Sequence, residues 1–249
     1  MKAIVLAAGY ATRLYPLTKD RPKPLLRVGE KTILDYLLKG FNQIPVLDRV
    51  YIVSNARFAS IFAEWARIVN QSDRHPGFQV EVLNDGSLDN ESRLGAIADV
   101  QFAIDQAGIE EDCIVAAGDN IFRFDFKDLH ETFQSHDADT IVVQELKDRE
   151  RLKQRGVVSF DANCKITLFE EKPQKPQSTY VCPALYMHKQ STLPLYKVFL
   201  NDHTTADAPG HFISWLYQQT PVYAYVMSRP ALDIGTLAVY KEIQKKYSI

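Results

Sequence analysis

Apolar and polar residues follow one another along the first half of the chain in blocks that are typical of a parallel β-sheet protein. Residues 2–8 form a short apolar run without polar alternation, which predicts a strand buried on both faces of a parallel sheet. Three further strands are predicted at residues 49–55, 78–84 and 113–120. The segments between the runs carry apolar residues at helical spacing. Strand and helix alternate repeatedly, which predicts an α/β fold with a doubly wound, mostly parallel sheet.

The helices of this half are predicted from their apolar stripes and their end signals. They cover residues 32–44, a segment around 58–69, and residues near 93–107. Thr32 is placed to cap the first helix, with Asp35 at its third position. The second helix is expected to bury Ile61 on its inner face. Gly108 is expected to end the third helix.

The second half of the chain has shorter connections and predicts a smaller, mixed and more antiparallel lobe. Its expected strands are residues 139–146, 156–160, 165–171, 179–188 and 222–228. Its expected helices lie near 190–201, near 210–219 and from Thr236 onward. No repeat and no clear linker interrupts the chain, so we expect one domain over residues 1–249, with the lobe beginning at about residue 140.

Composition and charge exclude several classes of partner. The 249 residues include 29 Lys and Arg against 31 Asp and Glu, a net charge of -2, so the chain lacks the basic excess of a nucleic-acid-binding surface. No apolar run approaches the ~20 residues of a membrane span, so no membrane partner is expected. The three cysteines are unevenly spaced and form no CxxC pair, which favours a reducing, cytoplasmic location.

Residues 8–24, directly after the first predicted strand, have the composition of a phosphate-binding loop. They contain Gly9, Thr12, Arg13 and Lys23, with Lys23 between two prolines. Backbone N–H groups at a glycine turn, a hydroxyl and a guanidinium all suit phosphate oxygens. Proline on both sides of a lysine restricts its backbone and aims its ammonium. Neither G-x-G-x-x-G nor a P-loop pattern is present, so no standard nucleotide motif accounts for the segment.

Two other polar segments, residues 84–92 and 118–120, also follow predicted strand ends. The carboxyl ends of parallel strands meet at one edge of a sheet, where ligands of such folds bind. We therefore expect both segments to join residues 8–24 around a single crevice.

Residues 6–26, LAAGYATRLYPLTKDRPKPLL, resemble the signature of the sugar-phosphate nucleotidylyltransferases, in particular the glucose-1-phosphate thymidylyl- and uridylyltransferases. Four further segments resemble motifs of this family in the same order: AAGDN at 116–120, RGVVSF at 155–160, FEEKP at 169–173 and LDIGT at 232–236. The resemblance implies a Rossmann-like nucleotidyltransferase fold, with a nucleotide-binding half at 1–139 and an acceptor-binding lobe with the C-terminal helix at 140–249.

The resemblance also implies an enzyme that joins a nucleoside triphosphate, expected to be UTP or dTTP, to a sugar 1-phosphate with release of pyrophosphate. Arg13 and Lys23 would be the catalytic residues, and Asp119 and Asp233 would hold Mg²⁺. The implied nucleotide-binding residues are Leu6, Ala8, Gly9, Thr12, Asn84 and Gly95. The implied acceptor-binding residues are Gly156, Glu171 and Lys172. The sequence leaves open whether the chain forms a homo-oligomer.

Strand alternation puts Glu171 and Lys172 on opposite faces of their strand. Both can serve one ligand only if the chain turns at Pro173, so we expect a turn there.

Three positions depart from the family pattern. Ala11 replaces a glycine of the signature, so its backbone is expected to avoid positive φ. Ala184 replaces a glycine of the sugar lobe, and Leu232 replaces an aromatic residue before the second metal aspartate. The loop at 84–97 also differs from that of the thymidylyl and uridylyl enzymes, so it does not by itself define the base.

Two other functions remain open at this point. A cytidylyltransferase acting on a small phosphorylated alcohol such as phosphocholine would need an aromatic cage, for which Tyr180, Tyr186 and Tyr223 are candidates. A non-catalytic nucleotide-sensing subunit would be marked by loss of a catalytic cation or a metal aspartate, and the sequence retains all of these residues.

Overall fold

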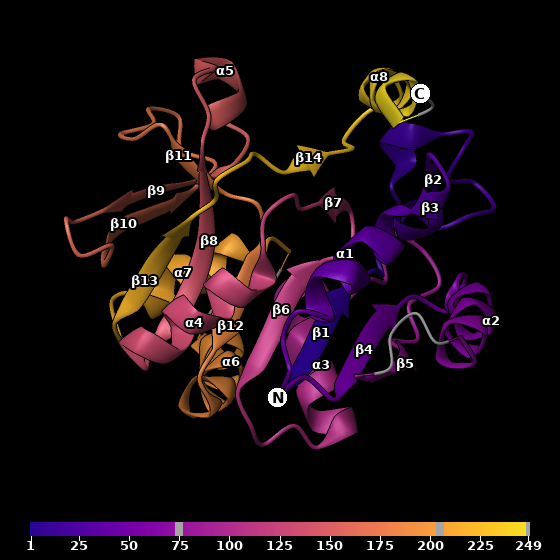
Figure 1. Ribbon diagram of the computed structural model, residues 1–249, viewed down its shortest axis with the longest axis horizontal. Helices are drawn as coiled ribbons and strands as arrows, with labels where there is room; N and C mark the ends of the chain where they lie inside the picture. The colour runs from indigo at the N-terminus through magenta and orange to yellow at the C-terminus, as the bar shows by residue number, and fades with distance from the viewer. Residues whose placement is uncertain (73–76, 203–206, 248–249) are drawn as a thin grey trace.

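The computed structural model describes residues 1–72, 77–202 and 207–247, and within them ten strands form one central sheet (Figure 1). These strands are β1 (Lys2–Leu6), β4 (Arg49–Ser54), β5 (Gln79–Asn84), β6 (Cys113–Ala117), β8 (Asp139–Glu145), β9 (Gly156–Phe160), β10 (Ile166–Glu171), β11 (Tyr180–Cys182), β12 (Leu185–His188) and β13 (Val222–Val226). Their order is β10-β9-β11-β8-β12-β6-β1-β4-β5, with β13 also paired to β8.

The directions of the strands divide this sheet into two regions. Strands β6, β1, β4 and β5 are parallel, as the apolar runs of the first half predict. Strand β12 is antiparallel to both of its neighbours, β6 and β8, and β9, β10 and β11 pair antiparallel as well. The predicted α/β fold with a more antiparallel lobe is therefore confirmed, and strands from both halves of the chain share one sheet.

Helices cover both faces of the sheet. They are α1 (Ile33–Phe41), α2 (Ala59–Asn70), α3 (Ala96–Ala107), α4 (Phe126–His136), α5 (Arg149–Leu152), α6 (Leu193–Asp202), α7 (Gly210–Leu216) and α8 (Leu237–Tyr247). Apolar residues of α1, α2 and α4 pack with Ala3 and Val5 of β1, whereas those of α3, α6 and α7 pack with Ile4. The central strands are thus buried on both faces, which explains their lack of polar alternation.

Short elements complete the chain. They are the strands β2 (Arg27–Val28), β3 (Lys31–Thr32), β7 (Asn120–Ile121) and β14 (Leu232–Asp233), and the 3₁₀ turns η1 (Thr12–Leu14), η2 (Lys23–Leu25) and η3 (Gln190–Thr192). Strand β14 pairs antiparallel with β7, so that Asp233 lies opposite Asn120. In Figure 1 the chain leaves β13, passes through β14 beside β7 and continues to α8.

The first helix begins as its sequence predicts. The backbone N–H of Asp35 donates to the Thr32 hydroxyl at 3.1 Å, and the N–H of Thr32 donates to the Asp35 carboxylate at 2.8 Å. This reciprocal pair satisfies two backbone donors that a helix start leaves free.

Three expectations about individual elements are wrong. Ile61 is 37% exposed on α2, because Phe62, Ala66 and Val69 form its buried stripe. The run at 179–188 is two strands, β11 and β12, interrupted at Pro183 and Ala184. The first strand ends at Leu6, so residues 7 and 8 already belong to the loop.

A buried polar network joins β8 to the segment after β12. Asp139, which is 2% exposed, accepts hydrogen bonds from the Lys189 backbone N–H at 2.8 Å and from the Thr192 hydroxyl at 2.6 Å, and its Oδ1 lies 3.2 Å from His188 Nδ1. His188 Nε2 lies 3.0 Å from the Tyr196 hydroxyl. Such a network stabilises the fold only while every member has its partner.

Among the described residues, no helix combines the length and the apolar character needed to cross a membrane.

Candidate active site

A cleft of about 280 Å³ opens where β1 and β6 end, and it brings together residues that are far apart in the sequence. Its lining includes the predicted residues Leu6, Gly9, Thr12, Arg13, Lys23 and Asp119, together with Arg93 and Gly235. Residues from the carboxyl ends of two neighbouring parallel strands thus meet at one crevice, as the topology requires.

The backbone at Ala11 corrects the expectation that this position avoids positive φ. Ala11 has φ +47° and ψ +43° and directly precedes η1. Its carbonyl accepts hydrogen bonds from the Leu14 N–H at 3.0 Å and from the Thr18 hydroxyl at 2.8 Å, and these contacts hold a conformation that costs a non-glycine residue about 1–2 kcal/mol. Ala184, the second glycine replacement, is also left-handed, with φ +51°. Both alanines therefore keep the backbone geometry of a glycine.

Lys23 is the buried cation of the cleft. It is 7% exposed, and its Nζ donates to Oδ2 of Asp119 at 2.7 Å. The same Nζ lies 3.9 Å from Oδ1 of Asp233, so two carboxylates converge on one ammonium. Arg13, in contrast, is exposed at the cleft wall, where its guanidinium is accessible to a ligand.

The Asp119 carboxylate is stabilised in its charged form by its cationic neighbours. Burial alone would raise the pKa of Asp119, but the adjacent Lys23 ammonium and, more weakly, Arg155 outweigh it and bring the pKa below its ordinary value. Asp233 has a second cationic partner, because the Arg155 guanidinium donates a short hydrogen bond to its Oδ2. Strands β7 and β14 bring these two aspartates, more than a hundred residues apart, to the same Lys23 ammonium, with Asp119 in the cleft lining and Asp233 beside it.

This arrangement fits a divalent cation. Two carboxylates converge on a position where a positive charge, the Lys23 ammonium, already lies. The described residues contain no group of three or more His, Cys, Asp or Glu side chains placed to hold a metal ion. Mg²⁺ commonly takes one or two protein carboxylates and completes its shell with waters and substrate phosphates, so Asp119 and Asp233 are a sufficient protein contribution.

Gly156, Glu171 and Lys172 lie close together at the start of β9 and the end of β10. A Cβ at Gly156 would lie 3.1 Å from Glu171 Oε2, and one at Gly210 would lie 2.0 Å from it, so the absence of a side chain at both glycines makes room for this carboxylate. Burial raises the pKa of Glu171, against the opposing charges of Lys172 and His211. The expected turn is present, because β10 ends at Glu171 and Lys172 has φ +51°.

A backbone hydrogen bond joins this group of residues to the aspartates. The N–H of Lys172 donates to the carbonyl of Arg155 at 2.9 Å, and the side chain of Arg155 reaches Asp233. The assignment of Gly156, Glu171 and Lys172 to acceptor binding stays a prediction.

Three predicted nucleotide-binding residues do not line the cleft. The carbonyl of Ala8 accepts from Asn55 Nδ2 at 2.7 Å and so fixes the loop from behind. Asn84, at the end of β5, accepts from the Gly86 N–H at 3.0 Å. Gly95 precedes α3 with φ +92°, a conformation suited to glycine. Their roles toward a nucleotide stay predictions.

The sequence did not predict the ion pair of Arg155 with Asp233. The one signal in the sequence was a cation directly before Gly156. Arg93 also lines the cleft, where it pairs with Asp207 at 2.9 Å.

A carboxyl pair lies under the loop that follows β5. Asp99, on α3, is 6% exposed. Two carboxylate oxygens, Oδ1 of Asp99 and Oδ2 of Asp85, are buried without a hydrogen-bond partner among the described residues. Burial and then the Asp85 carboxylate raise the pKa of Asp99 to about 7, while Arg93 opposes them. Because this folded-state pKa lies above the ordinary value of 3.8, the folded protein binds more protons than the unfolded chain between about pH 4 and pH 7.

We therefore expect stability to decrease as the pH rises from about 4 to about 7 and then to level off with respect to this group. Asp99→Asn removes the ionisation, so it should relieve about 2–4 kcal/mol of pH-dependent destabilisation above pH 7. Urea unfolding of both proteins at pH 5 and pH 8 measures the effect. Asp105→Asn, on the same helix, is the matched control, and an unchanged pH difference in Asp99→Asn would contradict the prediction.

The fold and the cleft define a doubly wound α/β protein that presents cations and convergent carboxylates at the ends of parallel strands. A family model described as "Nucleotidyl transferase" matches residues 2–248, and the chain belongs to this family. The family resemblance read from the sequence motifs is thereby confirmed.

Named relatives are similar over much of the chain. A glucose-1-phosphate adenylyltransferase from Lachnospira eligens is 27% identical over 253 residues, which cover 97% of this chain and 58% of that protein. A glucose-1-phosphate thymidylyltransferase from Neisseria meningitidis serogroup A is 29% identical over 203 residues, which cover 79% of this chain and 64% of that protein. The chain thus spans less than two thirds of the length of these relatives.

A solved structure, the UDP-glucose pyrophosphorylase complexed with UDP-glucose, superposes with a TM-score of 0.82 at 16% identity, covering 99% of this chain and 97% of that one. At this identity the likeness shows the fold, which is the Rossmann-like fold of nucleotidyltransferases.

Proposed function

We propose that the chain transfers a nucleoside monophosphate from a nucleoside triphosphate to a sugar 1-phosphate, producing a nucleotide sugar and pyrophosphate. The convergence of Asp119 and Asp233 on the buried ammonium of Lys23, beside the exposed Arg13, carries this proposal. The reaction joins two polyanions, so its main requirements are positioning and charge stabilisation, and no nucleophilic side chain is needed.

The roles of the residues follow from their charge and burial. In the proposed reaction a phosphate oxygen of the acceptor attacks the α-phosphorus in line, and the bond to the leaving pyrophosphate breaks. Arg13 is exposed and can bind the β- and γ-phosphates bidentately, so it would hold the leaving group. Lys23 is buried and oriented, so its ammonium would stabilise the charge that develops at the reacting phosphoryl group. Bound Mg²⁺ would add electrostatic stabilisation of the phosphate oxygens from Asp119 and Asp233.

We expect UTP or dTTP as the donor, although the named relatives include adenylyl as well as thymidylyl enzymes. A pyrophosphate-release screen of UTP, dTTP, ATP, GTP and CTP against a panel of sugar 1-phosphates and phosphocholine tests both substrates. If none of the donor–acceptor pairs releases pyrophosphate, the proposed transferase function is refuted and a nucleotide-sensing role remains.

Phosphocholine is a weaker candidate for the acceptor. Tyr186 is 2% exposed within the core, whereas Tyr180 packs against Phe160 and Tyr223 stacks on His136. A buried ring and two rings with different partners do not form the cage that a quaternary ammonium requires. Phosphocholine stays in the screen as the comparison compound.

We expect Asp119→Asn and Asp233→Asn each to raise the Mg²⁺ concentration needed for half-maximal activity about ten- to a hundredfold, because an amide binds a hard cation more weakly than a carboxylate does. A magnesium titration of the initial rate measures the shift. The control is Asp20→Asn, because the Asp20 side chain is 90% exposed in the loop that also contains Lys23. This variant should leave the magnesium titration unchanged. Full activity of the unmodified protein in excess chelator would contradict the metal assignment.

The effects of substituting Glu171 and Lys172 on kcat/KM should depend differently on the acceptor. Lys172→Ala removes a cation that any phosphorylated acceptor would meet, so it should weaken all acceptors alike. Glu171→Ala removes hydrogen bonds to hydroxyls, each worth about 1.5–3 kcal/mol, and should spare an acceptor with few hydroxyls. Measuring kcat/KM for a sugar 1-phosphate and for phosphocholine in both variants separates the two effects. If Glu171→Ala spares sugars and Lys172→Ala has no effect, the acceptor binds elsewhere.

A further inference from the structure

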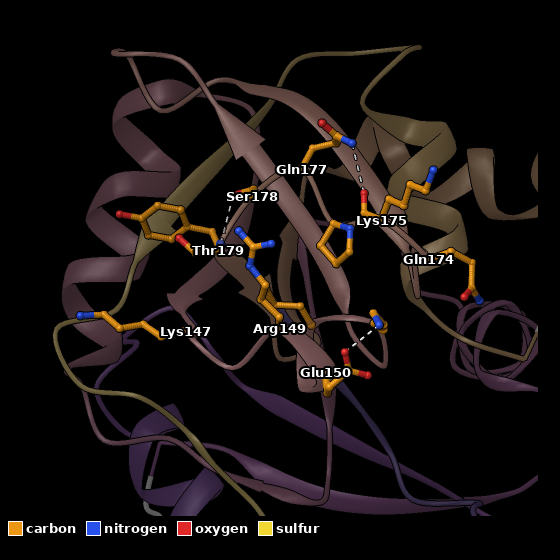
Figure 2. A pocket seen from close by; sticks show the side chains of 12 residues that line it. Lys147, Arg149, Glu150, Gln174, Lys175, Gln177, Ser178 and Thr179 are labelled. Carbon is orange, nitrogen blue, oxygen red and sulfur yellow. Dashed lines mark hydrogen bonds and ion pairs between the residues drawn. The ribbon is translucent and has the colours of Figure 1, made fainter.

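A second hollow, of about 710 Å³, lies on the lobe side of the molecule, between α5 and the loop that connects β10 to β11 (Figure 2). We refer to it as the basic pocket. It shares no lining residue with the active-site cleft. The residues that define its character are Lys147, Arg149, Lys153, Lys175, Ser178 and Tyr180.

The charge of the basic pocket is strongly unbalanced. Four cations line it against one carboxylate, Glu150, which is already paired with Lys153 at 2.7 Å. Lys147, Arg149 and Lys175 have no ion pair within the part of the chain that the structure describes. Figure 2 shows Lys147 and Lys175 toward opposite ends of the pocket and Arg149 between them. In a protein with a net charge of -2, such a local excess of positive charge selects an anion.

The pocket floor is apolar. Leu152 is 2% exposed and packs in a small core cluster with Val157 and Val181, while Pro176 also lines the hollow. Tyr180 is fixed by an edge contact with Phe160, at 4.9 Å between the ring centroids. An apolar floor with a few convergent polar groups is typical of a small-molecule site, and hydroxyl and guanidinium donors at its rim suit phosphate oxygens.

We propose that the basic pocket binds a phosphorylated small molecule at a site separate from the active-site cleft. The three unpaired cations would meet a group with two or more negative charges, and the accessible parts of Pro176 and Tyr180 would contact the organic part of the ligand. The proposal stands independently of the transferase activity, because it concerns residues that the proposed reaction does not use.

The covalent path from this pocket to the cleft is short. Helix α5 is followed within three residues by Arg155, whose guanidinium binds Asp233. The loop on the other wall begins after Lys172, whose N–H donates to the carbonyl of Arg155. A ligand that draws α5 and this loop together would therefore restrict both segments that hold Arg155, which gives occupancy of the pocket a route to the aspartates.

Hydrogen exchange of the full chain in the presence of inorganic pyrophosphate tests the proposal. Pyrophosphate should slow exchange in residues 147–153 and 174–180, and it should do so as well in the Arg13→Ala, Lys23→Met double variant, in which binding to the cleft is weakened. The triple variant Lys147→Gln, Arg149→Gln, Lys175→Gln should lose this protection, with an affinity about tenfold weaker for each cation removed.

The matched control removes the same charge from an exposed surface elsewhere, through Lys197→Gln, Lys241→Gln and Lys245→Gln, and should keep the protection. ADP and glucose 1,6-bisphosphate are then compared with pyrophosphate in the Arg13→Ala, Lys23→Met double variant. Tighter binding of ADP than of pyrophosphate indicates a nucleotide ligand, and tighter binding of glucose 1,6-bisphosphate indicates a sugar phosphate. Protection confined to residues 8–24, or equal protection in the triple variant and the unmodified protein, would overturn the proposal.

Discussion

Replacing Lys23 with methionine is expected to lower kcat/KM for nucleotidyl transfer about 100- to 1000-fold, the usual effect of removing one oriented charge-stabilising donor from an active site. Methionine keeps the buried apolar stem and removes only the ammonium that lies 2.7 Å from Asp119. The Asp119 side chain is 39% exposed and can be rehydrated, so the melting temperature should change by only a few degrees.

Steady-state kinetics with saturating Mg²⁺, together with a thermal melt, separate these two effects. Lys19→Met is the matched control, because Lys19 is an exposed lysine of the same segment and should retain full activity. A large decrease in melting temperature with activity retained would show that Lys23 is structural.

Asp139→Ala is expected to cost about 3–5 kcal/mol of the free energy of unfolding, the effect typical of breaking a buried charged network. The substitution leaves the Thr192 hydroxyl, the Lys189 N–H and Nδ1 of His188 without their Asp139 partner in a buried region. For a chain of 249 residues this corresponds to a melting temperature lower by about 10 °C.

The control for this substitution lies two residues away. Asp137 is 84% exposed and pairs with Lys189 at 2.9 Å, and its backbone is left-handed with φ +48°, which asparagine tolerates. Asp137→Asn therefore removes only a surface ion pair worth about 0–1 kcal/mol. Urea unfolding of the two variants should therefore differ by several kcal/mol. Equal midpoints would show that water or local rearrangement replaces the network.

Local chemistry made much of the fold predictable. The capping box of Thr32 and Asp35 lies within four residues, and each central strand is an unbroken apolar run, so both could be read from neighbouring residues. Helix α4 was not predicted. Its buried stripe of Phe126, Leu129 and Phe133 is short, and the rest of the helix is polar.

The candidate site was less predictable, because its geometry depends on pairing across long sequence separations. The motifs indicated Lys23, Asp119 and Asp233 one at a time, but no local pattern shows that the two aspartates converge on one ammonium. That convergence depends on β7 and β14, two-residue strands too short to have a recognisable period. The left-handed backbone at Ala11 was missed for a related reason, since its carbonyl contacts outweigh the local preference of alanine.

The pairing of β14 with β7 also has a consequence for the protein during its synthesis. A chain emerging from the ribosome would contain β1, β4, β5 and β6, and with them Lys23 and Asp119, long before residue 233 is added. Until then the Lys23 ammonium has only one of the two carboxylates that approach it, and the Arg155 guanidinium lacks the Asp233 carboxylate that it binds in the folded structure. Parallel pairing between distant segments forms late, as that of β13 with β8 must. The proposed nucleotide and metal site is therefore complete only after β14 has paired with β7, although most of its residues are in place on strands that are synthesised earlier.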